Sequence, residues 1–155
     1  LTKPHDLAVR NIISQVVKYG INEERIIFAE KIKIDDHISR QSCGDLFLDT
    51  FSSSAGTTAS IALSAGLPIV TLLGENLYAR QSSSILTACN LTELITYNKN
   101  EYEDLAYKLA TERELLKKIR EKIIDKKDCI YFDSINYTRE LENIYFNIIK
   151  SDLKN

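Results

Sequence analysis

Short apolar runs alternate with amphipathic segments along most of this chain. The runs have the length of buried parallel strands, and they predict strands at residues 25–28, 45–50, 69–73 and 94–96. Apolar residues at helical spacing predict a helix at 7–19, and the segments between the runs predict further helices at 35–43, 57–65 and 78–89. Strands that alternate with helices favour an α/β fold, a parallel sheet with helices on both faces. The brief run at 94–96 is expected near a sheet edge.

Several helix ends carry the residues that usually mark them. Gly20 follows the first predicted helix and Gly66 follows the third, so both are predicted stops. Asp35 and Asp36 stand in the first turn of the second helix, where the helix dipole favours negative charge.

Two capping-box spacings predict helix starts in the second half of the chain. Asn100 with Glu103 is the first, and Thr111 with Glu114 is the second. We therefore expect a break near Ala110 between two helices.

The C-terminal segment contains a linker and a last helix. Residues 126–133 are predicted as the linker, and apolar residues at helical spacing predict a helix over 136–150. An apolar helix face needs to be covered, so this helix is expected to dock on another surface. We interpret residues 1–155 as a single lobe.

The stretch 45–71 places small residues between a strand and a helix. Residues 52–56 have small side chains, and Thr57 stands where the helix begins. The first N–H groups of a helix have no intrahelical partner, and the helix dipole favours an anion there. Parallel sheets also bind ligands at the carboxyl ends of their strands. We predict that a nucleotide phosphate binds at Ser54, Ala55, Gly56, Thr57 and Thr58.

Structural roles compete with the functional ones in this stretch. Thr57 and Thr58 have the residue type of a plain helix N-cap, which is compatible with phosphate binding. Asp49 lies at a strand end, and we expect it to accept hydrogen bonds from loop N–H groups rather than to catalyse a reaction.

Composition excludes two classes of partner. The chain has 155 residues and a net charge of −2, with acidic and basic residues interspersed. A nucleic-acid surface needs a basic stripe, so no nucleic acid is expected. No apolar run is long enough to cross a bilayer and no signal peptide opens the chain, so no membrane is expected. The first residue is Leu1, which suggests a piece of a longer protein.

The cysteines match no known framework. Cys43, Cys89 and Cys129 are odd in number and far apart, which fits neither a set of disulfides nor the spacing of a zinc site. We expect reduced thiols, a cytoplasmic location and no metal.

Several short blocks of the sequence occur together in one order. In order and spacing they resemble the carboxyl-terminal lobe of the O-linked N-acetylglucosamine transferases. That family includes the SPINDLY-type plant O-fucosyltransferase and many bacterial proteins with tetratricopeptide repeats. The blocks are residues 25–28, 37–40, 45–50, 55–58, 65–68, 74–80, 93–95 and 101–102.

The resemblance implies a GT-B architecture, in which two Rossmann-like lobes face each other and this chain corresponds to the second. Members of the family transfer a sugar from a nucleotide donor to Ser or Thr of proteins, with inversion and without a metal. The resemblance thus implies a nucleotide-sugar donor and no cofactor. Uridine and guanosine donors both occur in the family, and a UDP-sugar that carries N-acetylglucosamine is the expected donor substrate. The first, catalytic lobe and the tetratricopeptide repeats would belong to the same longer chain, so the 155 residues alone are expected to be inactive.

The resemblance assigns roles to single residues but identifies no catalytic residue in this chain. His37 matches the histidine that packs on the nucleobase, and Arg40 matches the basic residue beside the base. Thr57 and Thr58 match the two threonines that hold the diphosphate through backbone and hydroxyl donors.

Three positions depart from the family pattern. Gly56 stands in place of a histidine of the animal enzymes, Ile61 in place of an aspartate that holds the ribose, and Ile34 in place of a lysine. An isoleucine cannot accept hydrogen bonds from ribose hydroxyls. These departures support an alternative, a non-catalytic nucleotide- or protein-binding module derived from this fold. A flavodoxin-like signalling domain is disfavoured, because residues 28–30 supply no acidic cluster.

Overall fold

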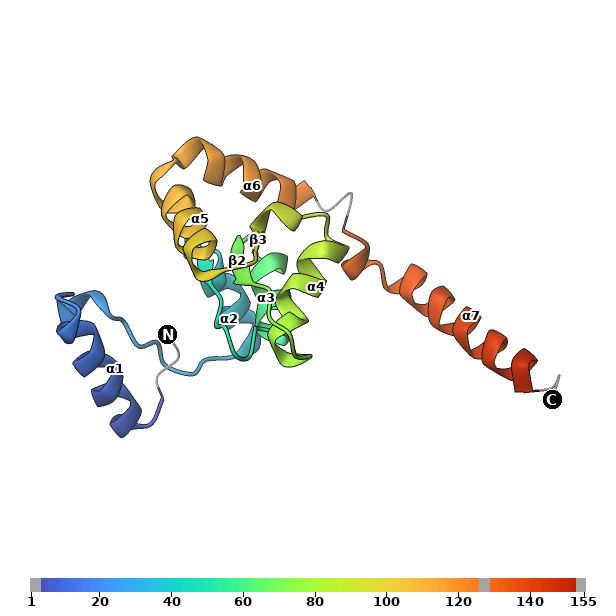
Figure 1. The fold of residues 1–155 in the computed structure, drawn as a ribbon, viewed down its shortest axis with the longest axis horizontal. Helices are drawn as coiled ribbons and strands as arrows, with labels where there is room; N and C mark the ends of the chain where they lie inside the picture. Colours follow the sequence, from blue (N-terminus) through green and yellow to red (C-terminus); the bar gives the residue numbers. More distant parts are fainter. Residues whose placement is uncertain (1–3, 126–128, 153–155) are drawn as a thin grey trace. The chain divides into compact units, whose positions relative to one another are not determined.

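The computed structural model of this chain describes residues 4–125 and 129–152 (Figure 1). The chain forms two compact units, one ending at His37 and the other beginning at Ile38.

The N-terminal unit opens with the helix α1 (Asp6–Lys18). The Nδ1 atom of His5 accepts a hydrogen bond from the N–H of Leu7 at 3.3 Å, which satisfies one of the donors at the helix start. Gly20 ends the helix with φ +75°, and its N–H donates to the carbonyl of Val17 at 2.9 Å. The predicted helix and its glycine stop are both confirmed.

The strand predicted at residues 25–28 is wrong. A short 3-10 helix, η1 (Glu23–Arg25), occupies the start of that segment. It is initiated by Asn22, whose Oδ1 accepts the N–H of Glu24 at 3.0 Å. Ile27 is 76% exposed, and Ile26 and Phe28 beside it are only half-buried, so the run lacks the fully buried face that would stabilise a strand.

The helix α2 (Ile34–Gln41) crosses from the first unit into the second. Asp35 and Asp36 lie in its first turn and Arg40 in its last, the distribution that the helix dipole favours. The predicted helix is therefore confirmed.

The second unit is built on a three-stranded parallel sheet in the order β1-β2-β3. Its strands are β1 (Phe47–Leu48), β2 (Ile69–Leu72) and β3 (Ile95–Thr96). The apolar runs at 45–50, 69–73 and 94–96 thus all contain strands, and β3 lies at an edge as predicted.

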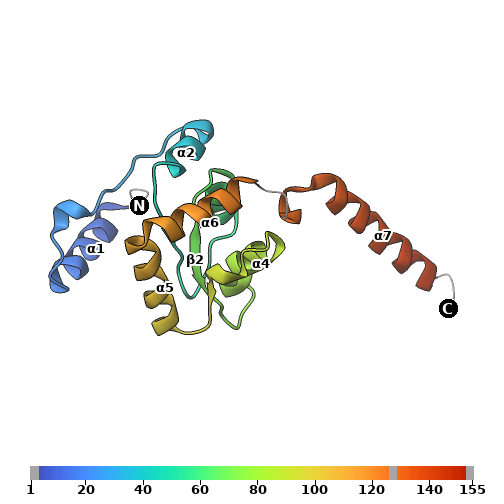
Figure 2. The same cartoon turned by 90° about the horizontal axis from the view of Figure 1, so that it is seen from above.

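Helices cover both faces of this sheet. In Figures 1 and 2, α5 lies on one side of β2 and α4 on the other, and α3 also contacts β2. The helices between β1 and residue 125 are α3 (Thr57–Ser64), the 3-10 helix η2 (Tyr78–Arg80), α4 (Gln81–Ala88), the 3-10 helix η3 (Thr92–Leu94), α5 (Lys99–Thr111) and α6 (Arg113–Asp125). This arrangement confirms the predicted α/β fold class with a parallel sheet.

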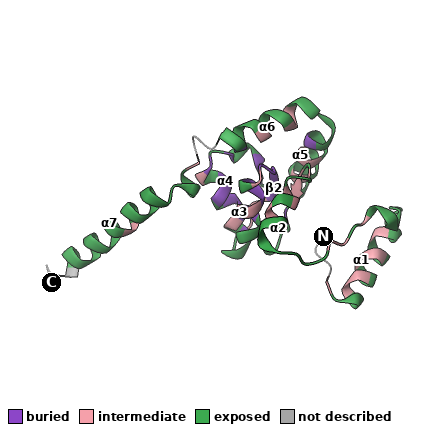
Figure 3. Ribbon diagram, turned by 180° about the vertical axis from the view of Figure 1, so that it is seen from behind, coloured by how far each residue is buried: buried purple, intermediate pink, exposed green. Residues whose placement is uncertain are grey.

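The core surrounds β2, as the buried regions in Figure 3 show. Ile69 and Val70 of β2 have no exposed surface, and Leu86 of α4 is equally buried. Each such side chain contributes about 1.5–3 kcal/mol through burial. Ala59 and Ala62 are also fully buried, so α3 can approach the sheet closely.

The two predicted capping boxes are not formed as expected. At the start of α5, the side chain of Asn98 accepts the N–H of Glu101 at 2.9 Å, and Glu101 accepts the N–H of Tyr97 at 2.8 Å. The box is therefore two residues earlier than predicted. Before α6, the Thr111 hydroxyl donates back to the carbonyl of Tyr107 at 2.9 Å. The break between the two helices is confirmed, but Thr111 does not cap the second one.

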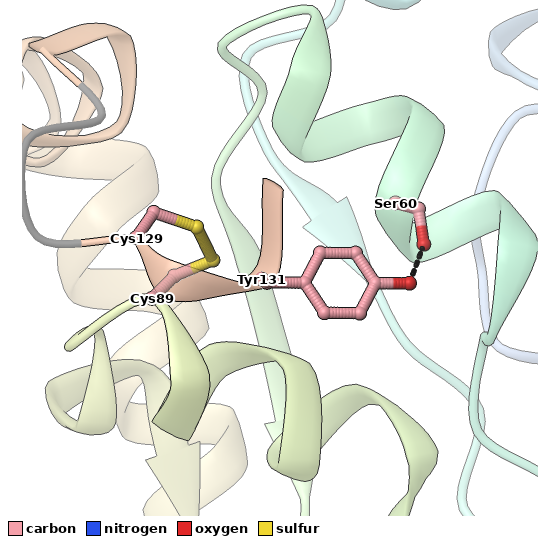
Figure 4. Close-up of a disulfide and its surroundings, with 4 residues drawn as sticks. All are labelled: Ser60, Cys89, Cys129 and Tyr131. Atoms are coloured by element: carbon pink, nitrogen blue, oxygen red, sulfur yellow. Dashed lines mark hydrogen bonds between the residues drawn. A yellow bond between two sulfur atoms is a disulfide. The ribbon is translucent and has the colours of Figure 1, made fainter. Parts of the chain in front are cut away.

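The expectation of three reduced thiols is contradicted. Cys89 and Cys129, 40 residues apart, form a disulfide (Figure 4), while Cys43 is free and exposed. Their pairing depends on the end of α4 meeting the segment that follows α6, which local sequence spacing does not reveal. Tyr131, two residues after Cys129, lies with its hydroxyl 2.7 Å from the Ser60 Oγ on α3.

The last helix, α7 (Ser134–Asp152), is longer than the predicted 136–150. It follows the short η4 (Ile130–Phe132), and its side chains are exposed from Ser134 to Ser151 except at Leu141. The predicted linker overlaps residues 126–128, which lie outside the described residues. That α7 docks on another surface stays a prediction. None of the described helices is both long and apolar enough to cross a membrane.

Candidate functional site

Asp49 organises the loop between β1 and α3. Its Oδ1 accepts the N–H of Thr50 at 2.8 Å and the N–H of Ala55 at 2.9 Å, while its Oδ2 accepts the Thr71 hydroxyl at 2.7 Å. Asp49 is 4% exposed and Thr71 is fully buried. The carboxylate therefore closes the loop on itself and joins it to β2. The structural role predicted for Asp49 is confirmed.

Ser54 joins the same loop to the segment before α4. Its N–H and its hydroxyl both donate to the carbonyl of Tyr78, at 2.9 and 2.8 Å. Its Oγ also accepts the N–H of Ser82 at 3.3 Å, and the Ser82 hydroxyl donates to the carbonyl of Ala55 at 2.7 Å. The backbone N–H groups of Ser54 and Ala55 are thus used inside the protein, and these two residues shape the loop.

Gly56, Thr57 and Thr58 form the N-terminus of α3. Unlike Ser54 and Ala55, they keep their N–H groups free of partners in the described chain. Gly56 is the N-cap, and α3 has no side-chain cap, so the interpretation of Thr57 as a plain capping residue is wrong. Both threonines are exposed. Within the described part of the chain, no hydrogen bond engages the N–H groups of these three residues or the two hydroxyls. A set of exposed donors at a helix N-terminus can hold a phosphate.

His37 and Arg40 lie one turn apart on α2, and both are half-buried. Residues three apart in sequence share a helix face. The structure places them on one helix as predicted, and their role in binding a base stays a prediction.

Tyr102 of α5 supports the loop from a third element. Its hydroxyl donates to the backbone carbonyl of Asp49 at 2.9 Å. Burial and, secondly, the negative charge of Asp49 raise the pKa of Tyr102 to about 12, so the phenol remains a donor at neutral pH. The ring of Tyr102 meets Phe51 edge-on at 5.0 Å, and the Lys99 ammonium lies 5.8 Å from the Phe51 ring centre.

Sequence reasoning missed the contribution of the segment before and within α4. Tyr78 and Ser82 bond to Ser54 and Ala55 from 24 to 28 residues away. In the sequence, the three consecutive serines at 82–84 indicate only a low helix propensity. Their use as loop anchors depends on where α4 lies in the fold.

Among residues 4–125 and 129–152, no cluster of three or more His, Cys, Asp or Glu side chains could hold a metal ion.

The chain is similar to known glycosyltransferases along most of its length. The model of the family described as glycosyl transferase family 41 matches residues 5–141. The UDP-N-acetylglucosamine--peptide N-acetylglucosaminyltransferase of Caenorhabditis elegans is 30% identical over 83% of this chain, which corresponds to 11% of the relative. The probable enzyme SPINDLY of Hordeum vulgare is 31% identical over 88% of the chain and 15% of the relative.

A solved structure shows the same fold. A mutant of the Thermobaculum terrenum O-GlcNAc transferase superposes with a TM-score of 0.84 at 28% identity, covering 90% of this chain and 27% of that one. The chain therefore spans only a small part of the proteins that it matches.

Proposed function

Because this chain belongs to glycosyl transferase family 41, we propose that it is the donor-binding lobe of a protein O-glycosyltransferase. The longer protein transfers a sugar from a UDP-sugar to Ser or Thr hydroxyls of proteins. The names of the relatives from Caenorhabditis elegans and Arabidopsis thaliana specify UDP-N-acetylglucosamine and a peptide acceptor, which supports N-acetylglucosamine as the sugar.

The observation that carries this proposal is the N-terminus of α3. The N–H groups of Gly56, Thr57 and Thr58 point to no partner in the described chain, and they follow the carboxyl end of a parallel strand. The diphosphate of the donor binds these groups together with the two threonine hydroxyls. The loop behind them is held by Asp49 and Ser54, so the donors are fixed before the ligand arrives.

The same N–H groups would also stabilise the leaving group of the transfer reaction. When the sugar departs, negative charge grows on the diphosphate. Preorganised N–H dipoles at a helix end stabilise that charge directly, so transfer proceeds without a metal. Transfer with inversion requires an acceptor hydroxyl to attack the face of the sugar opposite the diphosphate, and the groups that orient it belong to the lobe outside this chain.

The proposal extends to the partners of the lobe. The acceptor protein, the first lobe and the tetratricopeptide repeats meet it in the longer, cytoplasmic protein, and the 155 residues alone bind the donor without turning it over. His37 and Arg40 hold the base of the nucleotide.

Nucleotide titration of the 155-residue chain tests the proposal. Amide NMR shifts are followed on addition of UDP, UDP-N-acetylglucosamine, GDP and, as a control without phosphate, uridine. We expect UDP to move the amides of Gly56, Thr57 and Thr58 and uridine to leave them in place. A Thr58→Val variant keeps the N–H and loses the hydroxyl, so it separates the two contributions, and Thr92→Ala on η3 is the remote control.

Two outcomes would count against the proposal. Silence of residues 56–58 with every nucleotide would remove the phosphate site, and shifts elsewhere alone would favour the non-catalytic module. The same panel on the longer protein, with release of UDP as readout, tests the transferase activity itself.

A further inference from the structure

The side chain of Gln81 lies against the backbone of Gly56. A Cβ atom built on Gly56 would stand 2.2 Å from Oε1 of Gln81 and 3.4 Å from its Cδ. The amide of Gln81 therefore fills the space that any side chain at position 56 would take. The two residues are the first residue of α4 and the N-cap of α3.

Neighbouring hydrogen bonds fix this approach. Ser82, the next residue of α4, donates through its N–H to the Ser54 Oγ and through its hydroxyl to the Ala55 carbonyl. The start of α4 is thus tied to the two residues that precede Gly56. Because the backbone of α4 and the backbone of the loop are joined by these hydrogen bonds, the Gln81 side chain is held beside Gly56.

The Gln81 amide lacks a hydrogen-bond partner within residues 4–125 and 129–152. It is half-buried, and an amide offers two donors and an acceptor. Beside it, the N–H groups of Gly56, Thr57 and Thr58 are also without partners in the same part of the chain. A half-buried amide among several backbone donors has the composition of a site for an oxyanion with more than one oxygen.

We propose that Gln81 is a ligand-binding residue of the donor site, whose side-chain amide donates a hydrogen bond to a phosphate oxygen of the nucleoside diphosphate at the start of α3. The inference rests on the proposed function, because it assigns a further contact to the same ligand. It also explains why glycine occupies position 56: a side chain there would displace the amide.

Substitutions that separate packing from hydrogen bonding test this role. Gln81→Met keeps the length of the side chain without a donor, and Gln81→Glu keeps its shape but presents a carboxylate to the phosphate. Affinities for UDP and for uridine are measured by calorimetry on the 155-residue chain. A neutral hydrogen bond corresponds to roughly a threefold to tenfold change in affinity. We expect a loss of that size for UDP with Gln81→Met, a larger loss with Gln81→Glu, and no change for uridine.

The claim that a side chain at position 56 displaces the Gln81 amide is tested by a double-mutant cycle with Gly56→Ala and Gln81→Ala. Gly56→Ala alone should weaken UDP binding about as much as Gln81→Ala, because it displaces the amide. In the Gln81→Ala background it should add little, since no amide is left to displace. Ser84→Ala, at an exposed position of α4, is the control, and thermal melting of each variant verifies the fold.

The outcomes are distinguishable. If the unsubstituted chain binds no UDP, the proposed function and this inference both fall. If it binds UDP and Gln81→Met binds equally well, only the inference is overturned. Equal losses for UDP and uridine, or additive losses in the cycle, would show that Gln81 acts by packing and would also overturn it.

Discussion

Replacement of Asp49 by alanine is the sharpest test of how the phosphate-binding loop is held. Asp49 is buried, and its carboxylate accepts hydrogen bonds from Thr50, Ala55 and Thr71. Alanine removes all three acceptors. Thr50 is exposed and can bond to water instead. The Ala55 N–H and the Thr71 hydroxyl lie deeper and lose their partner.

The magnitude follows from those two donors. An unsatisfied donor as buried as the Thr71 hydroxyl costs about 1–3 kcal/mol, and the half-buried Ala55 N–H adds less, so Asp49→Ala should destabilise the fold by roughly 2–4 kcal/mol. That is a large share of the total, since domains are stable by about 5–15 kcal/mol. Asp49→Asn retains one acceptor oxygen for the two N–H groups and loses the charge assistance, so its cost should be smaller, about 1–3 kcal/mol.

Urea unfolding is followed by far-UV circular dichroism for the unsubstituted chain, Asp49→Ala and Asp49→Asn. It gives the free energy of unfolding of each protein. Asp45→Ala is the matched control, because Asp45 is an exposed acid four residues earlier and its loss should change stability by no more than about 0.5 kcal/mol. We also expect Asp49→Asn to weaken UDP binding, since the loop before Gly56 is less firmly held. The reasoning is refuted if Asp49→Ala costs no more than Asp45→Ala.

Two further predictions concern ionisation and oxidation. The pKa of Tyr102, raised by burial and by Asp49 from 10.0 to about 12, means that its stabilising contribution is present below pH 10 and is lost as the pH rises towards 12. In an ultraviolet titration Tyr102 should ionise after exposed tyrosines, and Tyr102→Phe should remove that late step; a profile unchanged by the substitution contradicts the assignment. The Cys89–Cys129 disulfide leaves one free thiol, Cys43, so a thiol assay on the unfolded, unreduced chain should detect one group, and three only after reduction. Detection of three thiols without reduction would exclude the disulfide.

Local sequence patterns predicted the structure correctly where side-chain burial and backbone geometry favoured the same outcome. The run at 69–73 forms β2 because four of its five residues are apolar and it lies between two other strands. Gly66 ends α3 as predicted, with φ +76°, a conformation that residues with a Cβ rarely adopt. Asp49 was correctly expected to accept loop N–H groups, since a buried carboxylate at a strand end needs donors nearby.

Local patterns failed where neighbouring residues offered competing structures. The run at 25–28 is apolar, but Asn22 stabilises a turn of 3-10 helix before it and Ile27 has no buried face. Around α5, both Asn98 and Asn100 precede an acid at the right spacing, and the earlier one forms the box. The sequence pattern does not distinguish the capping box at Asn98 from the one at Asn100, because each box would satisfy the same number of N–H groups.

The sequence by itself determined the α/β fold, the strands on either side of α3 and the place where α3 begins. These depend on hydrophobic periodicity and on residues close in the chain, whose effects are local. Only the tertiary structure decided which donors at that helix start remain for a ligand. Asp49 and Tyr78 take the donors of Ala55 and Ser54, and α4 brings Gln81 against Gly56. These contacts join residues distant in sequence, so their partners exist only once the sheet and its helices are assembled.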